Sequence, residues 1–362
     1  MRIGLVTNLL KSASVGGREL LCKVNYDALY SLHGDDLVVI QLSKNESRSK
    51  RGFKNAFLGH IDGLNNRVIS EMIQTLRDGK VTKVFVDGSN LGAFVESLKQ
   101  TLPNVEVITF FHNSEARFFL GSVRQKLSVH ALGVLFANYV AERKSVRCSD
   151  KIICLNQRDS RILKRLYGRG ATHIAPLVLE DRYVATCERP PESFALFVGG
   201  AFYANVAGIE WFIHEVVPHI HLPIYIVGRG FEVLREKLEI PGKVFVVGPV
   251  DDLTDWYSRA QFVIAPIFDG SGMKTKVAEA LMYGKKVVGT SEAFMGYEDV
   301  AGEAGWLCDS SDEFVAAITV AQLEIAQSFY PSLRHIYQLH YSMDSGRKRL
   351  SSILADEISN NL

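Results

Sequence analysis

Short runs of apolar residues alternate with longer amphipathic stretches along most of this chain. Apolar runs of this kind are typical of strands buried on both faces, and the stretches between them have helical spacing. Strands that alternate with helices in this way indicate a parallel sheet covered by helices. In the first half, the pattern predicts strands at Ile3–Thr7, Leu37–Leu42, Lys83–Val86, Val105–Phe111 and Lys151–Leu155, and helices near 17–32, 66–78, 91–101 and 123–147.

The alternation stops around Tyr183–Ser193, where two prolines and little periodicity indicate a linker. It then resumes, with predicted strands at Ala195–Gly199, Ile224–Gly228, Val244–Gly248, Phe262–Ile267 and Lys286–Thr290. We therefore predict two doubly wound α/β domains that face a cleft. Ligands of such folds bind at the carboxyl ends of the strands. The predicted boundaries are 1–182 for the first domain, 194–330 for the second and 331–362 for a helical tail.

Composition agrees with a globular protein of two domains. The chain has 362 residues, of which 47% are hydrophobic and 22% charged, and these values argue against a disordered or fibrous protein. The net charge of +1 argues against a general binder of polyanions. Residues 1–180 contain 26 Lys and Arg against 16 Asp and Glu, and the second half is acidic. This asymmetry indicates either two surfaces with different partners or a drift of surface charge without function.

The cysteines and the start of the chain bear on the compartment. Five scattered cysteines without C-x-x-C spacing argue against a disulfide framework and a zinc site. The opening MRIGLVTNLLK is typical of a first strand rather than a signal peptide, and no apolar run approaches the roughly 18 residues of a spanning helix. We expect a cytoplasmic protein, with peripheral contact at the inner face of the membrane as the further option.

The segment Phe262–Thr290 carries the most informative chemistry. A buried strand ends at Ile267, glycines follow, and a helix carrying Lys274, Lys276 and Glu279 comes next. Glycines let a ligand approach the backbone, and the start of a helix offers unpaired N–H groups that suit a phosphate. Lys274 adds positive charge there, and Glu279 is placed to accept hydrogen bonds from two vicinal hydroxyls, as in a ribose. The alternative is a plain strand–turn–helix with a surface Lys and Glu.

Three other predicted strands of the second domain also end in glycine-containing turns. These turns contain Gly199-Gly200, Arg229 between two glycines, and Gly248-Pro249. Each turn alone is a weak signal, but four such turns at one edge of a sheet indicate a nucleotide-like ligand.

The first domain offers fewer candidates. Gly16-Gly17 open a helix, but their spacing is not the G-x-G-x-x-G of dinucleotide-binding proteins. His112 follows the fourth predicted strand, where it is placed either to polarise a hydroxyl and carry a proton or to act as a hydrogen-bonded structural residue.

These residues together resemble the GT-B glycosyltransferases of family 4, a large group of retaining bacterial enzymes. The strongest match is VFVVGPVDDLTDWYSRAQFVIAPIFDGSGMKTKVAEALMYGKKVVGT, which follows the family's G-x-G-x-K-x-K-x-x-E-A loop and helix. LFVGGAFYANVAGIEWFIHEVVPHI resembles the start of the family's second domain, and GGREL, FFHNSEARFF and YVAERKSVRCSDKIICLNQRD resemble landmarks of its first. The resemblance implies two Rossmann-like domains, with the C-terminal helix crossing back to the first.

The resemblance also implies a function. The enzyme would move a sugar from a nucleoside-diphosphate sugar to a glycan or lipid-linked acceptor, with retention and without a metal or cofactor, in polysaccharide biosynthesis. Nucleic acid is not an expected partner. His112 would contact the transferred sugar, Lys274 would stabilise the leaving diphosphate, and Glu279 would bind the ribose. The implied donor-binding residues are Gly16, Gly17, Gly200, Arg229, Gly248, Val250, Gly270, Ser271, Gly272, Met273, Lys274 and Glu279.

Two departures from the family keep alternatives open. Ser271 stands where many members have a glutamate, and residues 201–207 lack the basic residues often found after the first strand of the second domain. Arg229 and Lys274 then remain as the main cations for a diphosphate. The alternatives are a nucleotide-sugar epimerase of similar fold and a catalytically silent relative that binds a nucleotide sugar or glycan. A dehydrogenase that uses NAD is less well supported.

Overall fold

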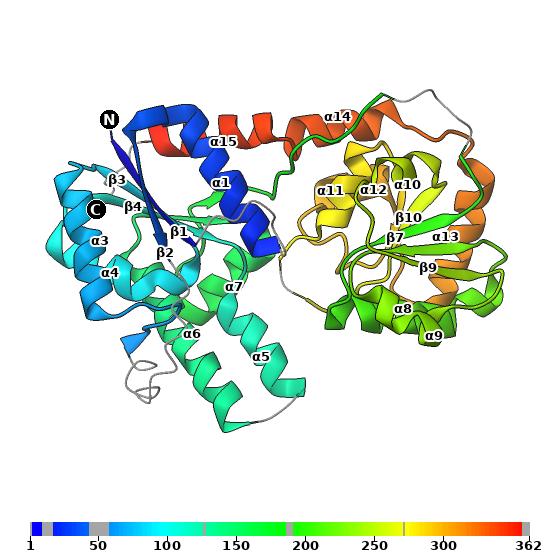
Figure 1. Ribbon diagram of the computed structural model, residues 1–362, viewed down its shortest axis with the longest axis horizontal. Helices are drawn as coiled ribbons and strands as arrows, with labels where there is room; N and C mark the ends of the chain where they lie inside the picture. The colour runs from blue at the N-terminus through cyan, green and yellow to red at the C-terminus, as the bar shows by residue number, and fades with distance from the viewer. Residues whose placement is uncertain are drawn as a thin grey trace. The chain divides into compact units, whose positions relative to one another are not determined.

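A computed structural model describes residues 2–8, 17–42, 58–125, 128–185, 191–270 and 272–356 (Figure 1). The chain divides into two compact units. One comprises Met1–Leu177 with Gly346–Leu362, and the other comprises Val178–Ser345. Each unit contains a six-stranded parallel sheet with helices packed against it, which confirms the predicted α/β class. Below they are called unit 1 and unit 2.

The sheet of unit 1 has the order β2-β1-β3-β4-β5-β6, and all its described pairs are parallel. The five predicted strands are confirmed to within one residue, because each is an apolar run with turn residues at its ends. A sixth strand of two half-buried residues was not predicted, since it has no apolar run. The strands are β1 (Ile3–Asn8), β2 (Leu37–Leu42), β3 (Lys83–Asp87), β4 (Glu106–Phe111), β5 (Lys151–Cys154) and β6 (His173–Ile174).

The helices of unit 1 differ from the prediction at two places. The helix Gln157–Tyr167 was not predicted. The single helix expected near 123–147 is wrong, because two helices occupy this region. Ser128 has an extended backbone and its hydroxyl accepts a hydrogen bond from Ala131 N, so it caps the second helix. The helices are α1 (Gly17–His33), η1 (Gly34–Asp36), α3 (Asn66–Asp78), η2 (Ser89–Leu91), α4 (Gly92–Thr101), α5 (Glu115–Gln125), α6 (Val129–Cys148) and α7 (Gln157–Tyr167).

The sheet of unit 2 has the order β12-β11-β10-β7-β8-β9. Its five predicted strands are confirmed to within two residues. The short edge strand β12 was not predicted. The strands are β7 (Ala195–Val198), β8 (Ile224–Val227), β9 (Val244–Gly248), β10 (Phe262–Ala265), β11 (Val287–Gly289) and β12 (Gly305–Leu307).

The helices of unit 2 lie between these strands and after them. They are α8 (Tyr203–Glu215), η3 (Val217–His219), η4 (Phe231–Leu234), α9 (Arg235–Leu238), α10 (Thr254–Arg259), α11 (Thr275–Met282), η5 (Glu298–Val300), α12 (Ala301–Ala304), α13 (Ser311–Glu324) and α14 (Pro331–His340). The last helix of the chain is α15 (Met343–Ala355). None of the helices in the described ranges is both long and apolar enough to cross a membrane.

The first segment of unit 1 ends at Leu177, five residues before the predicted end of the first domain at 182. Leu179 N donates to Tyr341 O (2.8 Å), and Tyr337 Oη donates to Leu179 O (2.9 Å). The Asp181 carboxylate also pairs with Arg334. These contacts tie residues 178–181 to α14, so this segment belongs with unit 2.

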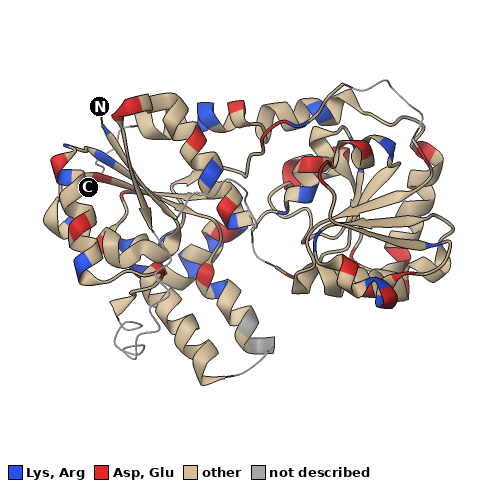
Figure 2. Ribbon diagram, viewed as in Figure 1, with Lys and Arg blue, Asp and Glu red and all other residues tan. Residues whose placement is uncertain are grey.

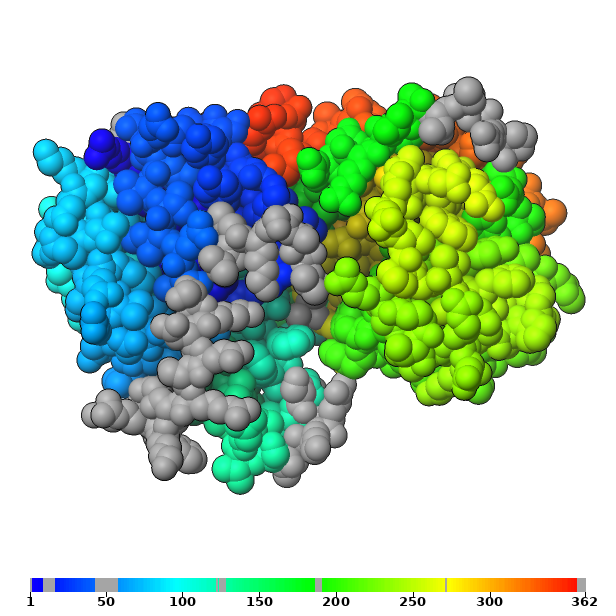
Figure 3. All heavy atoms as spheres, viewed as in Figure 1, coloured from blue at the N-terminus to red at the C-terminus, as the bar shows by residue number. Residues whose placement is uncertain are grey.

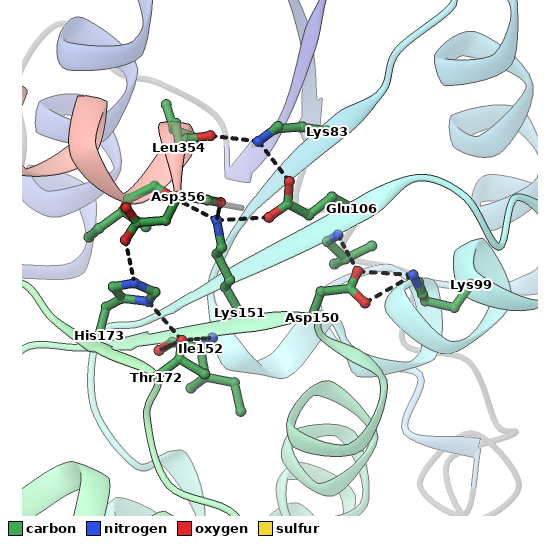
Figure 4. A network of polar contacts seen from close by, with 12 residues as sticks. Lys83, Lys99, Glu106, Asp150, Lys151, Ile152, Thr172, His173, Leu354 and Asp356 are labelled. Carbon is green, nitrogen blue, oxygen red and sulfur yellow. Dashed lines mark hydrogen bonds and ion pairs between the residues drawn. The ribbon is translucent and has the colours of Figure 1, made fainter. Parts of the chain in front are cut away.

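The predicted tail 331–362 is divided between the units, and its last part belongs to unit 1. In Figure 1, α15 runs beside α1, where Arg347 Nη1 donates to Ser31 Oγ (3.0 Å). Lys83 Nζ donates to Leu354 O (2.6 Å) and Lys151 Nζ to Ile353 O (2.8 Å) (Figure 4). Positive side chains at the last carbonyls of a helix satisfy those acceptors and complement the helix dipole.

Glu106 holds these two lysines in place from β4. Its carboxylate lies 2.8 Å from Lys83 Nζ and 2.9 Å from Lys151 Nζ. Burial alone would raise the pKa of Glu106, but the hydrogen bonds and charges of the two lysines lower it below its usual range. The end of α15 is therefore fixed to the sheet of unit 1 by charge-assisted hydrogen bonds.

We expect K151M to release the end of α15 from unit 1. The substitution leaves the Ile353 carbonyl without its donor, so the free energy of unfolding should fall by about 2–3 kcal/mol, the scale of a hydrogen bond to a charged group. Urea unfolding followed by circular dichroism measures this. R67A, which removes the exposed pair of Arg67 with Glu71, is the control and should leave the midpoint unchanged. Equal midpoints for K151M and the wild type would contradict the assignment.

Candidate functional site

Four neighbouring strands of unit 2 end in turns that touch one another. Because β10, β7, β8 and β9 are parallel and adjacent, their carboxyl ends meet at one edge of the sheet. Ala201 N donates to Arg229 O (2.8 Å), and Gly228 N donates to Gly248 O (2.8 Å). The structure thus brings three predicted donor-binding residues, Gly200, Arg229 and Gly248, to adjacent turns of this edge.

Two glycines make this close approach of backbones possible. A Cβ on Gly228 would lie 1.9 Å from Gly199 O, and a Cβ on Gly199 would lie 2.7 Å from Asn205 Nδ2. Both residues have a positive φ that L side chains rarely adopt. The turn after β7 is therefore bare backbone, with the Arg229 side chain exposed beside it.

The β10–α11 loop contains the predicted residues Gly270, Gly272, Met273 and Lys274. Lys274 Nζ donates to Gly272 O (3.0 Å) and pairs with Glu292 Oε1 (3.0 Å). The Met273 side chain is buried against Gly296. Glu292 was not predicted, because it lies in the loop after β11 and only the fold brings it to Lys274.

Glu279 lies on α11 next to two stacked tyrosines. Tyr257 Oη donates to Glu279 Oε2 (2.9 Å), and the Tyr257 and Tyr283 rings stack with centroids 4.6 Å apart. Burial raises the pKa of Glu279, although the Tyr257 hydrogen bond and the charges of Lys276 and Arg182 oppose this. The two tyrosines were not predicted, since an isolated tyrosine in a short helix carries no motif. Val250, half-buried, follows β9.

In unit 1, His112 takes part in a buried ion pair. The Asp87 carboxylate accepts hydrogen bonds from Thr7 Oγ1 (2.9 Å) and Asn25 Nδ2 (2.9 Å), and it lies 2.7 Å from His112 Nε2. Burial alone would lower the pKa of His112, but the charge and hydrogen bond of Asp87 raise it to about 9. The His112 charge in turn lowers the pKa of the Asp87 carboxyl against the effect of burial. The pair is therefore imidazolium and carboxylate at neutral pH.

A second polar cluster in unit 1 was not predicted. Arg18 Nη2 lies 3.0 Å from both Asp62 Oδ2 and Asn90 Oδ1, and Asn90 Nδ2 also donates to Asp62. The charges of this cluster also act on Glu115. Burial raises the pKa of the Glu115 carboxyl, whereas the positive charges of Arg18 and His112 lower it. The residues of this cluster are distant in sequence, so no spacing rule could have found them.

One group of side chains in unit 1 has ligand types that suit a metal. Ligand atoms of Cys22, Asp87 and His112 lie within 4.8 Å of one another, and no other such group occurs in the ranges described. The Asp87 oxygens already accept three hydrogen bonds, including the one from His112. This arrangement favours the ion pair over a metal centre.

The predicted site residues fall into two groups. Gly17 begins α1 and His112 follows β4 in unit 1, and the others described lie in unit 2. Gly16 and Ser271 lie outside the described residues.

The Asp87–His112 pair predicts a specific pH dependence of stability. A histidine whose pKa is raised on folding adds stability that is complete below its unfolded pKa of 6.5 and is lost as the pH rises through about 9. The stability difference between wild type and D87N should therefore be largest near pH 6 and shrink as the pH rises from 6.5 to about 9. Urea unfolding at a series of pH values measures it, with D36N at an exposed carboxylate as control. A difference that does not change with pH would contradict the ion pair.

Comparison with known proteins identifies the same region of the chain. Residues 192–322 match the sequence profile of the glycosyl transferases of group 1. No curated protein matches the chain in a sequence search.

Three solved structures are similar over nearly the full chain. HepE of Anabaena in complex with UDP has a TM-score of 0.69 at 13% identity and covers 98% of this chain and 100% of its own. Sucrose-phosphate synthase from Thermosynechococcus elongatus has a TM-score of 0.73 at 14% identity, and the alignment covers 98% of each chain. A glycosyltransferase from Rickettsia africae has a TM-score of 0.65 at 12% identity, with 100% and 99% covered.

The matched family segment spans the strand ends described above, from β7 to α13. The similar structures extend the likeness in fold to both units. These findings confirm the predicted fold and the prediction of a glycosyltransferase. The chain has the GT-B fold, and its residues 192–322 match the glycosyl transferases of group 1.

Proposed function

We propose that the protein transfers a sugar from a nucleoside-diphosphate sugar to a glycan or lipid-linked acceptor, with retention of configuration and without a metal. The observation that carries this proposal is the edge of unit 2, where bare glycine turns, Arg229, Lys274 and Glu279 follow adjacent strands. HepE, a similar structure, is described with UDP-glucose, so UDP is the first nucleotide to test.

The diphosphate would bind at the turns of this edge. Negative charge develops on the diphosphate as it leaves the sugar, and the starts of α8 and α11 offer unpaired N–H groups with positive dipole ends. Lys274 and Arg229 add positive side chains near these turns. The sequence has no D-x-D pair to hold a metal at the diphosphate, which supports a metal-independent reaction.

Glu279 would bind the ribose, and the turn from Gly248 to Val250 would lie beside the base. A carboxylate accepts hydrogen bonds from two vicinal hydroxyls, and Tyr257 holds one oxygen of Glu279 in place.

In unit 1, Gly17 and His112 would face the transferred sugar or the acceptor. Because the His112 ring is buried with Nε2 on Asp87, it would act mainly through its positive charge, which favours a negatively charged leaving group. Retention is supported by the resemblance to family 4.

We expect nucleoside diphosphates to raise the melting temperature, and one base to do so more than the others, with or without magnesium. The panel is UDP, GDP, CDP, TDP, ADP and NAD. For the best ligand, E279A should weaken binding by roughly 1–3 kcal/mol, the scale of hydrogen bonds to a charged group, as measured by calorimetry. E298A, at an exposed carboxylate of unit 2, is the control and should bind normally.

Three outcomes would contradict the proposal. A shift with NAD alone would exclude the donor class, and unchanged affinity in folded E279A would exclude the ribose contact. Donor binding without transfer or hydrolysis of the sugar would indicate the catalytically silent relative.

We also propose that unit 1 contacts an anionic membrane surface, where a lipid-linked acceptor resides. The first turns of α6 carry no Lys, Arg, Asp or Glu (Figure 2), and Val129 and Leu132 are 76% and 46% exposed. Arg143 and Arg147 continue the same helix and are also exposed. The α5–α6 region reaches the surface in Figure 3. A helix with exposed apolar side chains at one end and basic ones further along suits the interface of an anionic bilayer.

Co-sedimentation with vesicles tests this contact. We expect binding to vesicles of phosphatidylcholine with phosphatidylglycerol and little binding to phosphatidylcholine alone. V129S/L132S should abolish the binding, whereas V233S/L323S, at similarly exposed apolar residues of unit 2, should retain it. Equal binding of both variants would contradict a role for α6.

A further inference from the structure

A buried lysine lies against the turn that follows β7. Lys276 is 5% exposed, although it belongs to α11 on a neighbouring connection of the sheet. Its Nζ donates to Asn205 Oδ1 (2.9 Å) and lies 4.0 Å from the centre of the Phe197 ring. A Cβ on Gly199 would lie 3.4 Å from this Nζ, so the amine is directly next to the bare backbone of the turn.

The partners of Lys276 leave its charge without a bound anion. An ammonium has three donors, and among the described residues only the Asn205 amide accepts from it, with no carboxylate in hydrogen-bonding range. Burial of a charge in this state is costly, and burial lowers the pKa of Lys276 to about 7, although the more distant charge of Glu279 opposes this. A ligand that supplies negative charge next to Lys276 would offset the cost of burying this cation.

Two other lysines of unit 2 show the contrast. Lys285 is equally buried, but its Nζ donates to Ser258 O (3.0 Å) and Ala260 O (2.7 Å), which is a structural arrangement. Lys274 pairs with the Glu292 carboxylate. Both amines therefore have stronger acceptors than the one amide oxygen that faces Lys276.

The backbone next to Lys276 is also open to an anion. Asn205 Nδ2 donates to Gly200 O (2.8 Å), which fixes the turn at the start of α8. A Cβ on Gly200 would meet no atom closer than 3.7 Å, and in the described part of the chain nothing accepts a hydrogen bond from Gly200 N. A phosphate at this turn would meet the Gly200 N–H, the start of α8 and the Lys276 amine.

We propose that Lys276 binds the diphosphate of the donor at the β7–α8 turn, with Asn205 holding its amine in position. The inference rests on the proposed function and names a residue for it. Residues 201–207 of the turn and helix contain no basic side chain, so α11 supplies the positive charge at this place. The bound phosphate would in turn stabilise the ammonium form of Lys276.

Paired variants test the assignment. K276M keeps the length and apolar stem of the side chain and removes the amine, and K285M does the same at the structural lysine. Calorimetry with UDP and with uridine separates contacts to the diphosphate from contacts to the nucleoside. We expect K276M to weaken UDP binding by about tenfold or more and to leave uridine binding unchanged. K285M should bind both ligands normally.

Thermal stability distinguishes a binding role from a structural one. Removal of an incompletely paired buried charge should leave the melting temperature of ligand-free K276M equal or higher, whereas K285M should melt at a lower temperature. K276Q, which keeps a polar side chain, takes the place of K276M if K276M does not fold.

The outcomes separate this inference from the proposed function. If the wild type binds neither UDP nor any other nucleoside diphosphate, the proposed function fails. If the wild type binds UDP and K276M and K276Q bind it equally well, the assignment of Lys276 fails while the proposed function stands. A loss of uridine binding in K276M would also overturn the assignment, because it would indicate a distorted site.

Discussion

The requirement that buried polar groups be paired governs this structure. In parallel sheets covered on both faces, the polar groups that can bind a ligand lie at the carboxyl ends of the strands, where turns and helix starts meet. Asp87 shows the rule in unit 1, because three side chains satisfy its carboxylate. Glu106 shows it again, and there the pairing with Lys83 and Lys151 also fixes the end of α15 to the sheet.

One departure from this rule lies at the edge of unit 2 that we propose as the donor site. Lys276 is buried against a neutral amide, and the Gly199–Gly200 turn presents bare backbone next to it. The buried Lys285 amine has two backbone carbonyl acceptors, whereas Lys276 has a single amide oxygen. A diphosphate would supply the missing charge, so the same contacts that cost stability in the free protein would add affinity for the donor.

Much of the fold could be predicted, because it depends on local patterns. The ten predicted strands are apolar runs bounded by turn residues. Burial of their side chains determines where these strands form, without contacts that only the tertiary structure reveals. Strands β6 and β12 were missed because they are too short to show a pattern. The break between α5 and α6 was missed because a serine such as Ser128 also occurs within helices. Only the hydrogen bond from Ala131 N to its hydroxyl identifies it as a helix cap.

The site could be predicted only in part. Glycine turns, Lys274 and Glu279 stand in one segment with recognisable spacing, so their presence at a common edge followed from the sequence. The partners of the site residues could not be predicted. Glu292 reaches Lys274, Tyr257 reaches Glu279, and Asp87 reaches His112 only through tertiary packing. Lys276 was noted on the helix but given no role, because helical spacing does not reveal which strand end its side chain reaches.

The most direct test of the central claim is amide hydrogen exchange of the whole protein with and without UDP, followed by mass spectrometry. Ligand contact should slow exchange at backbone N–H groups of the turns themselves. The account predicts protection in peptides that cover 199–206 and 270–279 of unit 2, with little change around α13. Protection elsewhere, or none at saturating UDP, would contradict a donor site at this edge.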